Sequence, residues 1–221
     1  MARKHICIDF EGEGKRADGT LPHPSMLGAL VPGLDGRGKT YHLWMFEPEW
    51  LPMTRSPQME GSPANRKVCT LEQAVEELLT LADALDCRLV AFSEHEANMV
   101  NQHLPQNSNA RKGFSERFYN IRPKAKALAN RRRLQFADNT LISLLTALAP
   151  GHRWPPPPAC GVAEACRRLR GAGARSNKWR RWLPRHQQLA KDLIRYNRGD
   201  CVAVWRLVNR VCAHYSIEAL Q

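Results

Sequence analysis

Short segments in which apolar residues dominate or alternate with polar ones open the chain. Residues 5–10 alternate between the two classes, residues 26–31 are mostly apolar, and residues 40–46 are rich in apolar and aromatic side chains. Such segments are typical of β-strands with one or two buried faces. Turn-forming residues at 32–38 separate the second segment from the third, so we expect a hairpin there.

Helical spacing begins at Thr70. The sequence Thr-Leu-Glu-Gln allows a capping box between Thr70 and Gln73, and apolar residues then recur every three or four positions as far as Leu85. This pattern predicts an amphipathic helix. Residues 88–92 are apolar and predict a further strand, and residues 93–104 predict a second helix.

The rest of the chain continues the alternation of strand and helix patterns. Four consecutive prolines at 155–158 stop any helix there, and Gly199 is a candidate break in the last helix. Strands that alternate with helices predict an α/β fold, with a mixed central sheet flanked by helices. The remaining expected elements are loops at 48–67, 106–117 and 171–185, a strand at 134–137, and helices at 119–133, 139–148, 162–169 and 187–215.

Length and composition limit the class of protein. With 221 residues, 43% of them hydrophobic, the chain can form one domain with a substantial core, and it is not a collagen or a coiled coil. No run of roughly 18 apolar residues predicts a membrane span. We expect a cytoplasmic protein, because the chain shows no apolar signal segment. We expect a single domain over 1–221, with a basic insertion around 105–133 and a basic loop around 171–186.

The positive charge is concentrated in one part of the chain. The formal net charge is +12, but residues 111–195 hold 20 Lys and Arg against 4 acids, and the rest of the chain holds 13 against 17. Concentrated positive charge attracts a polyanion, so nucleic acid is the expected partner. The alternative is a solvated surface that only keeps the protein soluble.

Acidic residues at two places have a spacing that favours metal binding. Asp9 and Glu11 stand two apart in the first strand and therefore point to the same face. Their mutual repulsion would be offset by a hard divalent cation such as Mg²⁺ or Mn²⁺. Tyr196 and Asp200 stand four apart and share a face of the last helix, where a phenol can orient an attacking water. The alternative is a core tyrosine and an exposed aspartate.

Two further sets of acids lie at expected strand ends, where ligand sites form in α/β sheets. Glu94 and Glu96 follow the strand at 88–92, and Asp138 follows the strand at 134–137. Each has a structural alternative. Asp138 can cap the next helix, and the two glutamates can pair with the dipole of theirs.

Aromatic and basic residues are interleaved near residue 180. Cationic side chains neutralise phosphates, and aromatic faces stack on unpaired bases, so the pattern is typical of single-strand binding. The alternative is that the two tryptophans anchor a loop on the core. The candidate nucleic-acid-binding residues are Arg131, Arg132, Arg133, Lys178, Trp179, Arg180, Arg181 and Trp182.

The order of these motifs resembles that of the DEDD superfamily of 3′–5′ exonucleases, on the ribonuclease H-like fold. Asp9-Phe-Glu11 resembles the first motif, and Tyr196-x-x-x-Asp200 resembles the third motif of the tyrosine-containing, or DEDDy, branch. Glu96 lies where the family usually has the Asp of its second motif. Because this chain has Glu there, the second-motif acid stays open between Glu96, Glu94 and Asp138.

The resemblance implies a two-metal phosphodiester hydrolysis with Mg²⁺ or Mn²⁺. Asp9 would bridge the two ions, Glu11 would share the first, and Glu96 and Asp200 would complete the ligand set. Tyr196 would orient the attacking water. The implied function is a 3′–5′ exonuclease of single-stranded nucleic acid, with DNA slightly favoured over RNA.

Two other interpretations remain at this point. One is a catalytically weak or inactive nucleic-acid-binding subunit of the same fold, within a larger complex. The other is a different nuclease fold that uses Glu13-Gly-Lys15, an E-x-K pattern.

Overall fold

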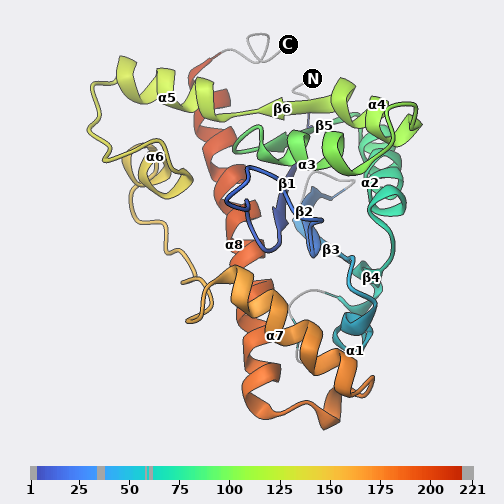
Figure 1. Ribbon diagram of the computed structural model, residues 1–221. Helices are drawn as coiled ribbons and strands as arrows, with labels where there is room; N and C mark the ends of the chain where they lie inside the picture. Colours follow the sequence, from blue (N-terminus) through green and yellow to red (C-terminus); the bar gives the residue numbers. More distant parts are fainter. Residues whose placement is uncertain (1–3, 34–37, 58, 60–61, 216–221) are drawn as a thin grey trace.

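The computed structural model describes residues 4–33, 38–57, 59 and 62–215 of the chain (Figure 1). Six strands form one mixed sheet in the order β4-β3-β2-β1-β5-β6. Strand β1 pairs antiparallel with β2 and parallel with β5, and β6 continues the parallel side. The strands are β1 (Lys4–Glu11), β2 (Met26–Pro32), β3 (Lys39–Met45), β4 (Arg66–Val68), β5 (Cys87–Ala91) and β6 (Phe118–Asn120).

Helices cover both faces of the sheet, and α8 runs the length of the molecule, with α7 near one end and α5 near the other (Figure 1). The helix α2 begins with the expected capping box between Thr70 and Gln73. The main helices are α2 (Leu71–Leu85), α3 (His95–His103), α4 (Asn109–Arg117), α5 (Arg122–Arg131), α6 (Leu141–Leu148), α7 (Val162–Arg175) and α8 (Pro184–His214). Short elements are α1 (Leu51–Thr54), η1 (Pro48–Trp50), η2 (Pro63–Asn65) and η3 (Trp179–Arg181).

The alternation of side chains along β1 divides the interior into two cores. Ile6, Ile8 and Phe10 point to one face, where they pack with residues of α2, α3 and α4. Cys7 points to the opposite face, where residues of α5 to α8 form the second core. Because successive strand residues alternate, Asp9 and Glu11 lie on the same face as Cys7, toward α8. The fold is thus α/β with a mixed sheet flanked by helices, as predicted, and its strand order is consistent with the ribonuclease H-like fold.

Helix α8 is continuous for 31 residues, so the expected break at Gly199 is wrong. A Cβ atom at Gly199 would lie 2.3 Å from Cγ of Pro155. The missing side chain therefore admits the proline segment against α8, and packing on both sides keeps the helix intact.

Three other expectations for local structure are wrong. Residues 134–137 form no strand, because the chain turns after α5: the amide of Leu134 donates to the carbonyl of Ala129, and Arg133 has φ of 55°. The expected loop at 106–117 contains α4, which buries Ala110 and Phe114. The helix α7 extends to Arg175, so the expected loop at 171–185 begins later.

The segment 48–67, expected as an exposed irregular loop, is tied to the core. Trp50 and Met53 are fully buried. Arg66 is 3% exposed, and its guanidinium donates to the carbonyls of Met53 and Ser56. The segment therefore closes one edge of the sheet through β4. Within the described residues, no helix has both the length and the hydropathy needed to cross a membrane.

Two glycines of α7 allow a matched test of this packing. A Cβ atom at Gly173 would lie 2.0 Å from the carbonyl oxygen of Glu49, whereas at Gly171 the nearest atom is Nη1 of Arg175, at 3.8 Å. We expect Gly173→Ala to lower the free energy of unfolding by about 1–3 kcal/mol through overpacking. Gly171→Ala should raise it by up to about 1 kcal/mol through helix propensity. Denaturant unfolding measures both, and equal effects would contradict the close packing of α7 on η1.

Candidate metal centre

Three carboxylates from the two ends of the chain meet where α8 crosses β1. Asp9 and Glu11 come from β1, and Asp200 comes from the middle of α8. One carboxylate oxygen from each lies within 4.8 Å of the other two. The strand spacing brings the first two acids to one face, and the docking of α8 adds the third.

Burial and mutual repulsion hold these acids toward their protonated forms. The pKa values of Asp9 and Glu11 lie well above their ordinary range, first because of burial and then because of the neighbouring carboxylates. Burial raises the pKa of Asp200 to about 7, against the lowering effect of the Tyr196 hydroxyl and the Trp154 indole. At neutral pH, without a cation, the cluster is therefore costly to ionise.

Two oxygens of the cluster are buried without a hydrogen-bond partner among the described residues. They are Oε1 of Glu11 and Oδ1 of Asp200. A buried acceptor without a donor costs free energy that a bound cation would offset. Carboxylate oxygens are the ligands that Mg²⁺ and Mn²⁺ prefer. The residues present therefore fit a divalent cation held by Asp9, Glu11 and Asp200.

Glu96 is buried and interacts electrostatically with this cluster, whereas Glu94 is exposed. Glu96 is 4% exposed, and its charge raises the pKa values of Asp9 and Glu11. Burial raises its own pKa to about 7, although the Ser93 hydroxyl donates to its Oε2 at 3.3 Å. Glu94 is exposed and accepts a hydrogen bond from the Asn120 side chain at 2.9 Å. Of the two glutamates, Glu96 is the one placed to join a metal shell.

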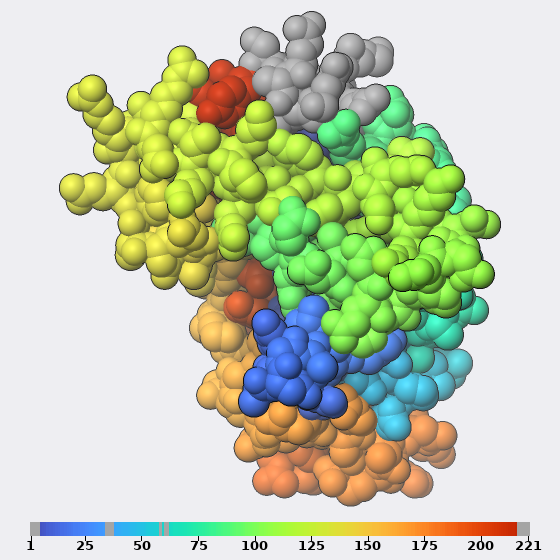
Figure 2. Space-filling model, turned by 45° about the horizontal axis from the view of Figure 1, so that its top comes forward, coloured from blue at the N-terminus to red at the C-terminus, as the bar shows by residue number. Residues whose placement is uncertain are grey.

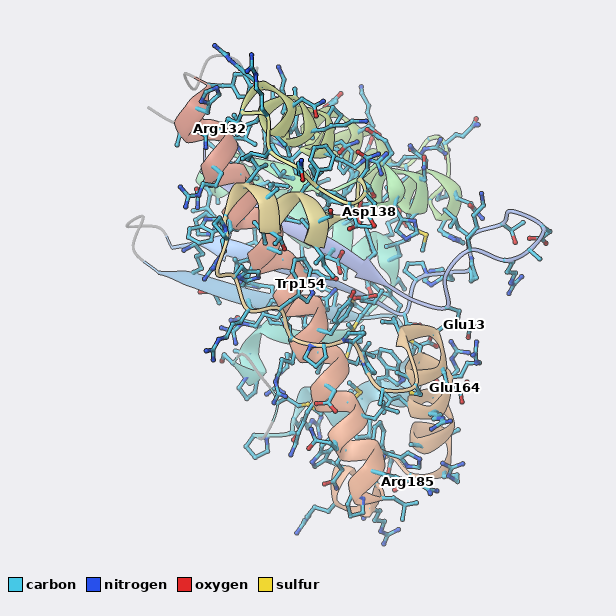
Figure 3. The ribbon with its side chains drawn as sticks, turned by 90° about the vertical axis from the view of Figure 1, so that its left-hand side faces the viewer. Glu13, Arg132, Asp138, Trp154, Glu164 and Arg185 are labelled. Carbon is cyan, nitrogen blue, oxygen red and sulfur yellow. The ribbon has the colours of Figure 1, made fainter. Side chains whose placement is uncertain are left out.

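Asp138 lies at the start of α6 and is exposed (Figure 3). Its Oδ1 accepts from the amide and the hydroxyl of Thr140, at 3.0 and 2.6 Å. Thr140 in turn caps α6. Asp138 is therefore not the N-cap itself but holds the residue that is, and it does not belong to the group of three carboxylates.

Tyr196 lies one turn before Asp200 on α8 and is half-buried. Its hydroxyl lies near the Asp200 carboxylate and lowers the pKa of that acid. Burial, then the charges of Asp200, Glu11 and Asp9, raise the pKa of the phenol. Tyr196 therefore stays protonated at neutral pH and can donate a hydrogen bond inside the site.

Asn197 is a site residue that the sequence patterns did not reveal. It is fully buried, and its Nδ2 donates to Oδ2 and to the carbonyl of Asp9, at 2.8 and 3.1 Å. Its Oδ1 accepts from the Tyr41 hydroxyl at 2.6 Å. Gly28 pairs with Asp9 across β1 and β2, and a Cβ atom there would lie 1.8 Å from the same Oδ1. The one available signal was an isolated glycine in an apolar strand.

The segment before α7 lies along α8 beside Asp200. Figure 3 shows Trp154 against this helix, and Pro155 contacts it at Gly199. The indole Nε1 of Trp154 and Oδ1 of Asp200 are both buried without a hydrogen bond among the described residues. The indole thus acts on the pKa of Asp200 without meeting the geometry of a hydrogen bond.

The cluster borders an open cavity of about 300 Å³. Glu11 lines the cavity together with the glycine-rich loop after β1, His95 and Met99 of α3, and the first turn of α7. Figure 2 shows a hollow on this face between the blue N-terminal loop and the yellow segment, with part of the red α8 at its floor. A ligand can therefore reach the cluster from solvent at Glu11.

The tryptophans near residue 180 differ in their exposure. Trp182 is 4% exposed, and its indole donates to the carbonyl of Ser176 at 2.8 Å. It therefore anchors the loop, and its expected role in stacking on bases is wrong for this conformation. Trp179 is half-buried, with its ring centre 5.3 Å from that of Trp182. It lines a groove of about 790 Å³ together with Arg55, Lys178, Arg180 and Arg181.

The second basic cluster lies elsewhere. Arg131, Arg132 and Arg133 are exposed at the end of α5. Figure 3 shows Arg132 and Arg185 at opposite ends of the molecule, with the segment of Trp154 between them. Arg132 and Arg185, from the two basic segments, therefore lie on different parts of the surface, on either side of Trp154.

The E-x-K pattern forms no site of its own in the structure. Glu13 accepts from Arg170 of α7 at 2.9 Å, and the same guanidinium holds Glu47 at 2.8 Å. Lys15 is exposed. The arrangement contradicts a catalytic Glu13–Lys15 pair and indicates that Arg170 fixes the loop beyond Glu11.

The chain matches no model of a known protein family, and no curated protein matches it either.

The raised pKa values predict a fall in stability with rising pH. Asp200 and Glu96 have ordinary values of 3.8 and 4.5, and both are raised to about 7. Below about pH 3 both groups are protonated in the folded and in the unfolded chain, so the penalty is absent. It accrues as the pH rises toward 7 and is complete above that. With EDTA present, we expect the free energy of unfolding to be about 2–4 kcal/mol lower at pH 8 than at pH 5.

Asp200→Asn should weaken this pH dependence, because it removes one of the buried carboxylates whose ionisation destabilises the fold. Asp86→Asn, at an exposed position with φ of 47° that Asn tolerates, is the control and should keep it. Mn²⁺ should stabilise the wild type more at pH 8 than at pH 5. If the pH dependence is unchanged in Asp200→Asn, the conclusion that ionisation of this cluster destabilises the fold is wrong.

Proposed function

We propose that the protein is a divalent-metal-dependent 3′–5′ exonuclease that hydrolyses the phosphodiester bonds of single-stranded nucleic acid. The observation that carries the proposal is the convergence of Asp9, Glu11 and Asp200 within 4.8 Å, beside a cavity open to solvent. Tyr196 and the buried Glu96 complete the set of side chains that the resemblance to DEDDy exonucleases implies. The direction of degradation and the slight preference for DNA rest on that resemblance alone.

The chain's own residues have distinct tasks in this reaction. Bound divalent cations would neutralise the charge of the scissile phosphate and lower the pKa of the attacking water. The ionised carboxylates of Asp9, Glu11 and Asp200 would hold the cations. Asn197 fixes the Asp9 carboxylate through its Nδ2, at 2.8 Å. The protonated Tyr196 hydroxyl, near Asp200, would orient the water for in-line attack.

Positive charge at two places on the surface supports a polyanionic substrate. The groove at Trp179 and the arginines at the end of α5 are two separate basic surfaces. Each can attract a phosphate backbone, while the cluster itself repels it until a cation is bound. A cytoplasmic setting goes with this proposal, since the seven cysteines are all free thiols.

Substitution of the first and third acids tests the activity. We expect Asp9→Asn and Asp200→Asn each to lower Mg²⁺- or Mn²⁺-dependent cleavage of a 3′-labelled single strand by at least about a thousandfold, because charge neutralisation at the phosphate is lost. Asp138→Asn is the control and should cleave at the wild-type rate. Wild-type activity in either of the first two variants would refute the assignment. Binding without cleavage by the wild type would favour a nucleic-acid-binding subunit.

The two glutamates of α3 and its N-cap allow a matched test of the second acid. Glu96→Gln should lower the cleavage rate by at least about a hundredfold, since it removes a buried charge next to the cluster. Glu94→Gln changes an exposed residue and should leave the rate within about twofold of the wild type. A large loss of activity in Glu94→Gln, with little change in Glu96→Gln, would identify Glu94 as the second-motif acid.

A further inference from the structure

A second cavity, of about 630 Å³, lies between α7, the N-terminal part of α8 and the segment that precedes α7. It is separate from the cavity at Glu11, but the two are neighbours. Cys160 lines this one, and Val162, two residues further, lines the other. The polar side chains that line the second cavity are those of Cys160, Arg168, Arg185, His186, Gln188 and Asp192.

The cationic groups of this cavity are only partly neutralised. Arg185 is exposed and has no ion pair among the described residues. Figure 3 shows it near the start of α8, beside α7. His186 is 8% exposed, and its pKa is lowered by burial and then by Arg185, Arg175 and Arg168. The charges of three arginines act on this buried imidazole, which indicates a region of positive potential.

The nearby acids are engaged elsewhere. Asp192 accepts from Gln188 at 2.9 Å and pairs with Arg195 at 3.4 Å. Glu164 pairs with both Arg167 and Arg168, at 2.9 and 2.7 Å. One carboxylate thus faces two guanidinium groups of α7. Positive charge is therefore in excess around the cavity.

The start of α8 adds to this excess. The helix has no side-chain cap and no acidic residue in its first turn. Pro184 has no N–H, and the amide of His186 donates to the carbonyl of Leu183. The amide of Arg185 can therefore meet an anion there, together with the positive end of the helix dipole. Arg185 and His186 belong to that turn and line the cavity. Side chains and backbone therefore favour the same kind of ligand.

The position of the cavity relates it to the metal centre. Arg168 lies about 9 Å along α7 from Val162, and Arg185 lies about 22 Å along α8 from Asp200, at 1.5 Å per residue. A strand whose end reaches Glu11 can therefore continue past the first turn of α7 into this cavity. We propose that the cavity is a phosphodiester-binding site, in which Arg168, Arg185 and the start of α8 hold a backbone phosphate several nucleotides from the cleaved end.

The site itself rests on the cavity and its charges, and the choice of a nucleic-acid strand as the source of the phosphate rests on the proposed function. Cys160 provides the readout. It lines the cavity and is half-buried, and Cys69 is a half-buried thiol outside it. Alkylation of both by iodoacetamide can be followed by peptide mass spectrometry on the full chain in EDTA, which prevents metal-dependent cleavage. The competitors are inorganic phosphate, a mononucleotide and a single-stranded decanucleotide.

We expect the decanucleotide to slow alkylation of Cys160 at the lowest concentration, and phosphate and the mononucleotide to do so only at higher ones, with Cys69 unaffected. Protection by phosphate or mononucleotide without protection by the decanucleotide would overturn the strand as ligand. Absence of protection by all three would overturn the site, whatever the cleavage assays show. Cleavage can fail while Cys160 is protected, so the two proposals fail separately.

Two exposed arginines of α8 give the matched variants. Arg185→Gln should weaken binding of a fluorescent decanucleotide by about tenfold, as expected for a lost charge-assisted contact. Arg210→Gln removes the same charge near the other end of the helix and should change binding by less than about twofold. Arg168→Gln should weaken binding as Arg185→Gln does. Equal effects of Arg185→Gln and Arg210→Gln would show that only the net charge matters for binding, and would overturn the proposal.

Discussion

The repulsion between Asp9, Glu11 and Asp200 is the constraint on which the rest of the site depends. Their oxygens lie within 4.8 Å of one another, and the burial of the group makes ionisation costly. Asn197 donates to one oxygen of the cluster, Oδ2 of Asp9. Oε1 of Glu11 and Oδ1 of Asp200 still have no donor among the described residues. A divalent cation would satisfy both oxygens and offset most of the negative charge of the three carboxylates.

That cluster exists only because α8 packs closely on the sheet, and small residues permit the contact. Gly28 leaves room for Asn197, which ties the helix to the backbone and the carboxylate of Asp9. On the other side of the helix, Gly199 leaves room for Pro155. One helix is therefore held from two sides at the level of Asp200. The same close packing of α8 fixes the position of the Asp200 carboxylate, which would bind the cation.

Local periodicity predicted the elements that carry the chemistry. The period of two in β1 put Asp9 and Glu11 on one face, and the helical period put Tyr196 above Asp200. The contacts of Asn197 with Tyr41 and Asp9 join residues more than 150 positions apart, so no local pattern indicates them. The choice of Glu96 over Glu94 depends on how α3 begins after β5.

The errors have physical causes as well. Residues 134–137 have the alternation of a strand, but Leu134 and Phe136 pack on the core from an irregular segment. The tryptophan pattern near residue 180 is equally consistent with anchoring and with stacking, and burial of Trp182 decided for anchoring. The basic stretch is continuous in sequence, but the fold places its two arginine-rich parts at opposite ends of the molecule (Figure 3). Charge counted along a chain does not specify a surface.

The most direct test of the account is a crystal of the protein soaked in Mn²⁺ and measured at the manganese absorption edge. The account predicts anomalous peaks in contact with Asp9, Glu11 and Asp200, at about 2.1 Å from their oxygens. Glu96 should lie against the same peaks, directly or through a water. A fully soaked crystal with no peak at these three carboxylates, or with Mn²⁺ bound only elsewhere, would contradict the central claim that this cluster is a metal centre.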